Sequence, residues 1–145
     1  MEESRPRTPN VTLSERKDLP IEQLDGLFQA IGWKTRGQEK WKEVLDKSSH
    51  VLSVWDGERI IGIGRILEDG VMCMFYDIGV HPDYQRKGVG KKLMERLIDL
   101  VKDKGYASIG LFAWEENPAN KPFYEQFGFV QQTSGMELVK HMVRE

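Results

Sequence analysis

The sequence has little of what marks secreted, membrane-spanning or nucleic-acid-binding proteins. A single cysteine, Cys73, stands among 145 residues, so no disulfide can form within the chain and a reducing compartment is favoured. No apolar run approaches the roughly 20 residues that span a bilayer. The polar start, MEESRPRTPN, lacks the apolar segment of a secretory signal. The net charge of -2 gives no broad basic field for nucleic acid. We therefore expect a cytoplasmic protein with neither a membrane nor a nucleic-acid partner.

Metal-binding and activated-cysteine patterns are also missing from the sequence. The histidines His50, His81 and His141 do not have the spacing of metal ligands. No neighbouring pair of a histidine and an acid is evident that would turn Cys73 into an acyl-carrying nucleophile. We therefore expect a protein without a metal.

Helical and strand patterns fill the first half of the chain. The apolar residues of IEQLDGLFQAI recur at helical spacing after Pro20, and a second helix is predicted from Gln38 to Lys47. Asp56-Gly57 is a two-residue turn between two β-rich runs, which predicts a hairpin. A long strand is predicted from Val71 to Val80.

The second half adds two helices and three strands to this pattern. A helix with an apolar face is predicted after Gly88, and ASIGLFAW is a short buried strand. Asn117-Pro118 predicts a helix start and Gly128 a helix stop, followed by FVQQT and GMELVKHMV as a closing hairpin. The order indicates one mixed α/β domain over residues 10–145, preceded by a flexible tail at 1–9.

The stretch YQRKGVGKK, residues 84–92, places four cations around two glycines where a strand leads into a helix. Glycines let backbone N–H groups approach a ligand, and a helix N-terminus carries partial positive charge, so this turn is suited to an anion. It is no dinucleotide fingerprint, because Leu93 occupies the third glycine position, and no Walker A loop, because Lys92 follows Gly90-Lys91. A plain tight turn with solvated lysines is the alternative.

Three features in order carry a family resemblance: IGVHPDY, then QRKGVG, then NPANKPFYEQFGF. From about Val51 onwards the chain resembles the GNAT superfamily of acyl-CoA-dependent N-acetyltransferases. The resemblance implies an α/β (α+β) fold with one mixed, mainly antiparallel sheet. About six to seven strands, about four flanking helices and a splayed central strand pair are expected. The implied reaction is acetyl transfer from acetyl-CoA to a primary amine of a small molecule or peptide, by direct attack in a ternary complex. A non-catalytic acyl-CoA-binding sensor or scaffold is the alternative.

The resemblance also implies which residues bind acetyl-CoA. Backbone groups of the splayed strand would pair with the pantetheine arm, and N–H groups of the glycine turn would hold the pyrophosphate. The residues implied are Ile78, Gly79, Val80, Gln85, Arg86, Lys87, Gly88, Val89, Gly90, Lys91 and Asn117. The sequence departs from the common family pattern at Asn120, where a small alanine is usual, and at Pro122.

Two residues match catalytic positions of the family. Tyr124 in FYEQFGF matches the tyrosine that commonly serves as the general acid; packing in the core is its alternative role. Asp77 is a carboxylate within an apolar strand, and it is a candidate base or, equally, a structural acceptor of hydrogen bonds. A water relay would make a base unnecessary.

The acceptor amine is not specified by the sequence. Family acceptor sites are lined by the first two helices, their loop and the strand ends, and the candidates here are Trp33, Arg36, Trp41, Trp114, Glu115 and Glu116. The glutamates would favour a cationic acceptor and the arginine an anionic one, so these indications conflict. Dimers are common in the family, and a homodimer is possible.

Overall fold

The computed structural model describes residues 10–114 and 116–138. The chain divides into two compact units, residues 1–112 and residues 113–145. The predicted tail at 1–9 and the last part of the predicted closing hairpin, residues 139–143, lie outside the described residues. Among the described residues, no helix is both long and apolar enough to cross a membrane.

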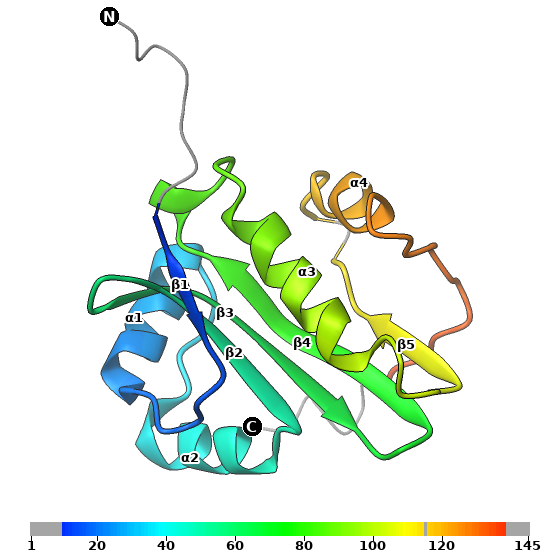
Figure 1. The fold of residues 1–145 in the computed structure, drawn as a ribbon, viewed down its shortest axis with the longest axis horizontal. Coiled ribbons are helices and arrows are strands. Elements are labelled where there is room, and N and C mark those ends of the chain that lie inside the picture. The colour runs from blue at the N-terminus through cyan, green and yellow to red at the C-terminus, as the bar shows by residue number, and fades with distance from the viewer. Residues whose placement is uncertain (1–9, 115, 139–145) are drawn as a thin grey trace, which may run out of the picture. The chain divides into compact units, whose positions relative to one another are not determined.

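The first unit is built on a five-stranded mixed sheet (Figure 1). In sheet order and in chain order its strands are β1 (Thr12–Ser14), β2 (His50–Asp56), β3 (Arg59–Glu68), β4 (Met72–Val80) and β5 (Ser108–Leu111). Neighbouring strands from β1 to β4 are antiparallel, and β5 runs parallel to β4. The mixed, mainly antiparallel sheet that was expected is therefore confirmed.

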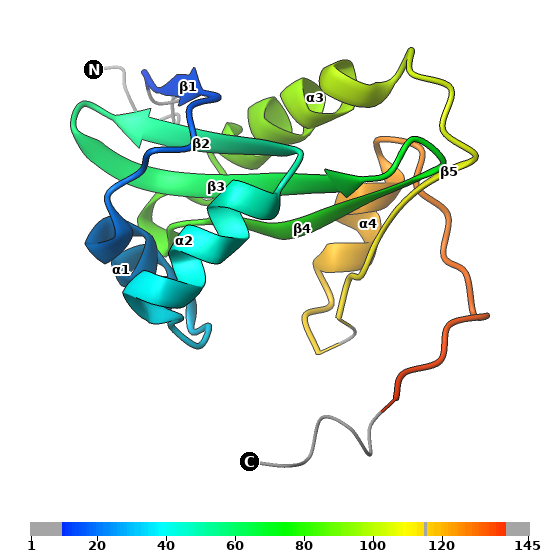
Figure 2. The ribbon, with the colours of Figure 1, turned by 90° about the horizontal axis from the view of Figure 1, so that it is seen from below.

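Helices cover both faces of this sheet (Figure 2). The helices α1 (Ile21–Ile31) and α2 (Gly37–Lys47) lie on one face, and α3 (Val89–Val101) lies on the other. A short 3-10 helix, η1 (Pro82–Tyr84), connects β4 to the turn before α3. The three helices predicted in this unit and the Asp56-Gly57 hairpin are thus present with nearly the expected bounds.

The cores on the two faces explain why these segments fold together. On the α1/α2 face, Leu24, Phe28 and Trp41 are buried against Ile63 of β3. On the α3 face the helix approaches β3 closely at Gly64, where an added Cβ would lie 2.9 Å from a methyl group of Leu97. Each large apolar side chain buried in this way contributes roughly 1.5–3 kcal/mol.

The second unit contains α4 (Asn120–Glu125) and no strand among its described residues. The segment FVQQT, predicted as a strand, has no strand structure, and neither do the described residues of GMELVKHMV. The described sheet therefore has five strands where six to seven were expected. One of the five, β1, was not predicted, because three residues are too short to show an alternating pattern.

Candidate acyl-CoA-binding site

The last part of β4 is paired on one side only. Pairing with β5 runs from Met72 opposite Ser108 to Phe75 opposite Leu111 and extends no further. Pairing with β3, on the other side, continues to Val80. Beyond Phe75 the β5-facing edge of β4 therefore has backbone groups without a strand partner among the described residues, and this splayed edge could accept an extended ligand as an added strand.

A β-bulge separates the two parts of β4. Ile63 lies opposite Gly79 and Arg65 opposite Tyr76. Between these two pairs β4 therefore contains one residue more than β3, which is the definition of a β-bulge. The extra residue lies at Asp77, whose φ of 54° is unusual for a residue other than glycine. Strained conformations of this kind persist where surrounding contacts determine them, and they cluster at functional sites.

The register indicates which β4 groups face the open edge. The N–H of His81 donates to the carbonyl of Ile61 at 2.8 Å. In an antiparallel pair every second residue hydrogen-bonds to the neighbouring strand, so His81 and Gly79, on either side of Val80, are the residues that hydrogen-bond to β3. By alternation, the N–H and C=O of Val80 and of Ile78 point away from β3, whereas those of Gly79 point toward it. The side-chain amide of Gln85 donates to the Val80 carbonyl at 2.9 Å, in agreement with this assignment.

The glycine turn follows η1 directly and contains two residues in the left-handed backbone conformation. Arg86 has a φ of 63° and Gly88 a φ of 85°, and α3 begins at the next residue, Val89. The first N–H groups of an α-helix have no acceptor within the helix, and left-handed residues can turn successive N–H groups into a concave anion site. The turn is anchored by Gln85 and by Tyr84, whose hydroxyl donates to Asp56.

Four cations surround this turn: Arg86, Lys87, Lys91 and Lys92. All four are exposed, and none forms an ion pair with a carboxylate of the described residues. They are therefore available to a phosphate group. Together, the open edge of β4 and the cationic turn at α3 fit a long ligand with an amide-containing arm and a pyrophosphate, which is the chemistry of coenzyme A.

Asp77 is enclosed by two arginines that sequence reasoning did not connect with it. Arg36 Nη1 and Nη2 donate to Asp77 Oδ2 and Oδ1 at 2.6 and 3.0 Å, and Arg65 Nε donates to Oδ2 at 2.6 Å. Burial alone would raise the pKa of Asp77, but the hydrogen bonds and charges of the two arginines outweigh it and lower that pKa. A carboxylate held in this way is a poor proton acceptor, so the geometry favours the structural role over the catalytic base.

The α1–α2 loop, residues 32–36, supplies part of this arrangement. Arg36 N–H and Trp41 Nε1 both donate to Asp25 Oδ1, at 2.9 and 2.7 Å, which fixes the start of α2. Trp41 is fully buried and so does not line an acceptor site. Trp33 is 38% exposed and packs on Gly79 of β4, where an added Cβ would lie 2.8 Å from the indole ring.

The second unit contains the remaining predicted site residues. Tyr124 lies in α4 and packs edge-to-face on Phe123, with ring centroids 5.0 Å apart; burial raises the pKa of Tyr124 to about 12. The helix begins at Asn120, so Asn117 is not its N-cap. Asn117 Oδ1 instead accepts from the Ala119 N–H at 3.0 Å, which closes a local turn. Asn120, which replaces the usual alanine, is the first residue of α4, and its side-chain amide donates to the Trp114 carbonyl at 3.0 Å.

The structure also bears on Cys73, on the potential metal ligands and on the remaining acceptor candidates. Cys73 is fully buried in β4, and burial, with a smaller effect from Glu68, raises the pKa of its thiol, so it is no exposed thiolate nucleophile. No group of three or more potential metal-ligating side chains occurs in the described part of the chain. Of the acceptor candidates, Glu116 and Trp114 are exposed residues of the second unit, and Glu115 lies outside the described residues.

Comparisons with known proteins agree with this chemistry. Residues 15–129 match the model of the acetyltransferase (GNAT) family. The chain is 33% identical to an uncharacterized N-acetyltransferase, ycf52-like, of Prochlorococcus marinus, over 84% of this chain and 69% of that protein.

Solved structures show the same fold. A GNAT family acetyltransferase from Streptococcus pneumoniae superposes with a TM-score of 0.75 at 28% identity, covering 88% of this chain and 96% of that one. Another, from Elizabethkingia anophelis with acetyl-CoA bound, superposes with a TM-score of 0.71 at 20% identity, covering 94% and 86%. The chain therefore belongs to the acetyltransferase (GNAT) family.

Proposed function

We propose that this protein transfers an acetyl group from acetyl-CoA to a primary amine of a small molecule or peptide, by direct attack in a ternary complex. Family membership makes it an acetyl-CoA-dependent N-acetyltransferase. The kind of acceptor and the mechanism are the proposed parts. The observation that carries the proposal is the open edge of β4, which leads directly into a cationic turn at the start of α3.

Acetyl-CoA binding is proposed at that edge and turn. Ile78 and Val80 would pair with the pantetheine arm, and Gly79 between them leaves room for Trp33. The N–H groups from Arg86 to Lys91 would hold the pyrophosphate, with Gln85 fixing the turn to the strand. Asn117 remains a proposed pantetheine contact on the strength of the resemblance alone.

The reaction needs three changes at the bound substrates. The acceptor ammonium loses a proton, and the amine nitrogen then bonds to the thioester carbonyl carbon while negative charge develops on the carbonyl oxygen. The C–S bond next breaks, the nitrogen loses its second proton to water as the amide forms, and the thiolate is stabilised or protonated as it leaves. A β4 N–H that faces the open edge is the proposed donor to the developing oxyanion.

Tyr124 is the proposed group that stabilises the leaving thiolate. Because burial raises its pKa to about 12, the phenol stays protonated throughout the physiological range. An ordinary thiol has a pKa of about 8.5, so complete proton transfer from such a phenol to the thiolate would be unfavourable. A hydrogen bond from the phenol to the sulfur, with water supplying the final proton, fits this raised pKa better.

For the proton of the acceptor amine, we propose a water relay in place of Asp77. The two arginine contacts occupy both oxygens of Asp77 and lower its pKa, which opposes a base role near neutral pH. The acceptor's identity, a homodimer and a cytoplasmic location remain predictions. Arg36 is committed to Asp77, so it gives no support to an anionic acceptor.

The first test is ligand-dependent stability, with ATP and NAD as controls. Acetyl-CoA at about 100 times its dissociation constant should add roughly 2.7 kcal/mol to the free energy of unfolding. A comparable rise with ATP would indicate a nucleotide-binding domain instead. The absence of any rise with saturating acetyl-CoA would remove the basis of the proposed site.

The second test separates an enzyme from an acyl-CoA sensor. Tyr124→Phe should leave acetyl-CoA affinity unchanged and lower acetyl transfer at least about tenfold, because a hydrogen bond to a charged group such as the leaving thiolate contributes roughly 1.5–3 kcal/mol. Release of CoA with a panel of amines is the measurement. A wild-type protein that binds acetyl-CoA but acetylates no amine or peptide would favour the sensor. Unchanged turnover in Tyr124→Phe would remove Tyr124 from this role.

A further inference from the structure

The α1–α2 loop contacts β4 at two points, one on each side of Ile78. Trp33 packs on Gly79, and Arg36 forms a bidentate pair with Asp77. We call these two contacts the loop clamp. Ile78, which lies between the two contacts, is one of the residues whose backbone faces the open edge of β4. The loop therefore holds the strand where the thioester is proposed to lie.

The Arg36 side of the clamp is rigid. The guanidinium carbon lies 5.0 Å from the ring centroid of Phe28 and 4.7 Å from that of Trp41, so the group packs against two aromatic rings, one from α1 and one from α2. Its backbone N–H is fixed by Asp25. A planar guanidinium with two parallel hydrogen bonds also defines the orientation of the carboxylate, which a lysine would not do.

The Asp77 side is held from a second direction. Arg65 of β3 donates to the same carboxylate, donates to Ser48 Oγ at 3.1 Å, and lies over the ring of Tyr76. The side chains of Arg36, Arg65 and Asp77 are only 25%, 13% and 14% exposed. These contacts from two elements explain how a left-handed, non-glycine residue is maintained at the bulge.

We propose that the loop clamp is a positioning device for acetyl transfer, in which Arg36 and Asp77 act as one unit that sets the direction of the open-edge N–H groups of β4. Neither residue needs to touch the acetyl group, because each acts through the strand. The inference rests on the proposed function and adds to it a role for the acceptor-side loop. It also gives Asp77 a task that requires its charge but no proton transfer.

The test compares Arg36→Ala, Asp77→Asn and the double variant with the wild-type protein. Small displacements of reacting groups can cost up to about 100-fold in rate, so kcat should fall roughly 10- to 100-fold in each single variant. Acetyl-CoA affinity, measured by calorimetry without an acceptor, should fall by a much smaller factor than kcat, since the glycine turn proposed to hold the pyrophosphate is intact. The double variant should be no slower than the slower single one, because the two residues act as a unit.

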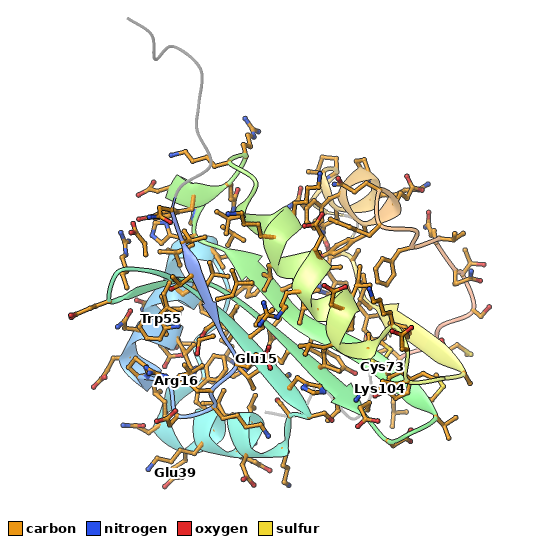
Figure 3. The ribbon with its side chains drawn as sticks, viewed as in Figure 1. Glu15, Arg16, Glu39, Trp55, Cys73 and Lys104 are labelled. Atoms are coloured by element: carbon orange, nitrogen blue, oxygen red, sulfur yellow. The ribbon has the colours of Figure 1, made fainter. Side chains whose placement is uncertain are left out.

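Arg16 provides a matched control, because it also stacks on a tryptophan and pairs with an aspartate. Its guanidinium lies 5.1 Å from the ring centroid of Trp55 and 3.7 Å from Asp18, next to β1 and away from β4 (Figure 3). Arg16→Ala should retain wild-type kcat. If Arg36→Ala does not fold, Arg36→Lys takes its place and should lose kcat in the same direction, because one ammonium cannot make the bidentate pair.

The outcomes separate this inference from the proposed function. A wild-type protein that fails to bind acetyl-CoA overturns the proposed function itself. With binding and turnover intact, an unchanged kcat in the Arg36 variants, an additive double variant or a parallel loss of acetyl-CoA affinity overturns the clamp. The dependence of kcat/KM on pH decides the role of Asp77. The fall of kcat/KM on the acidic side of the pH profile should persist in Asp77→Asn. Loss of this fall in the variant would identify Asp77 as the base.

Discussion

The two units of the chain differ in how firmly their residues are held. Every buried side chain of the described residues lies in the first unit, between Leu19 and Val101. The second unit, with Tyr124, has only half-buried and exposed side chains in its described part. The proposed cofactor edge is thus built on a packed core, whereas Tyr124, the proposed hydrogen-bond donor to the leaving thiolate, lies in a segment that has no fully buried side chain among its described residues. Substitutions in the packed core of the first unit should therefore mainly affect stability, and substitution of Tyr124 in the second unit should mainly affect turnover.

Matched aromatic truncations give the largest expected contrast. Phe28 is 2% exposed in the first core, whereas Phe127 is half-buried in the second unit. Phe28→Ala should lower the free energy of unfolding by about 3–5 kcal/mol. Phe127→Ala should cost less than about 2 kcal/mol, because less surface returns to water. Urea denaturation measures both, and equal losses would contradict the contrast between the units.

The buried ion pairs should make the first unit sensitive to acid. The pKa of Asp77 is lower in the folded protein, so its stabilising effect is complete above its ordinary pKa of about 3.9 and is lost as pH falls below that value. Asp77→Asn leaves Arg36 and Arg65 without their carboxylate and should cost about 3–5 kcal/mol at pH 7. The variant should also lose part of the wild-type dependence of stability on pH below about 4. The same acid dependence in both proteins would exclude Asp77 as its source.

Two left-handed glycines test whether the turn binds the cofactor. Gly88 and Gly105 have φ values of 85° and 77°; Gly88 directly precedes α3, and Gly105 lies in the loop that follows it. Alanine should destabilise each by about 1–2 kcal/mol, but only Gly88→Ala should weaken acetyl-CoA binding, by about tenfold or 1.4 kcal/mol. Calorimetric titration provides the comparison. Equal affinities in the two variants would indicate that the turn is merely structural.

A glycine inside α1 gives the smallest expected effect. An added Cβ at Gly26 would meet no heavy atom within 4 Å, and the residue is exposed. Gly26→Ala should raise the free energy of unfolding by about 0.5–1 kcal/mol through helix propensity and leave kcat unchanged. Thermal unfolding is a suitable measurement. A loss of stability would show that α1 is more tightly constrained at this point than its open surroundings suggest.

Local patterns predicted most of the elements and the position of the turn. Helical spacing predicted α1, α2 and α3, and Asp56-Gly57 predicted the hairpin, because these depend on neighbours in the sequence. The pairing of Asp77 with Arg36 and Arg65 joins residues 41 and 12 positions apart, so no local pattern contains it. The start of α4 also differed, because Asn117 and Asn120 bond to nearby backbone groups and do not cap the helix at Asn117.

Hydrogen exchange of the β4 amides, followed by NMR with and without acetyl-CoA, tests the central claim most directly. The account predicts that saturating acetyl-CoA slows exchange at Ile78 and Val80, which face the open edge. Gly79, which the register turns toward β3, should change little, and ATP should protect neither residue. Unchanged exchange at both Ile78 and Val80 under saturating acetyl-CoA would contradict the proposal that this edge binds the cofactor.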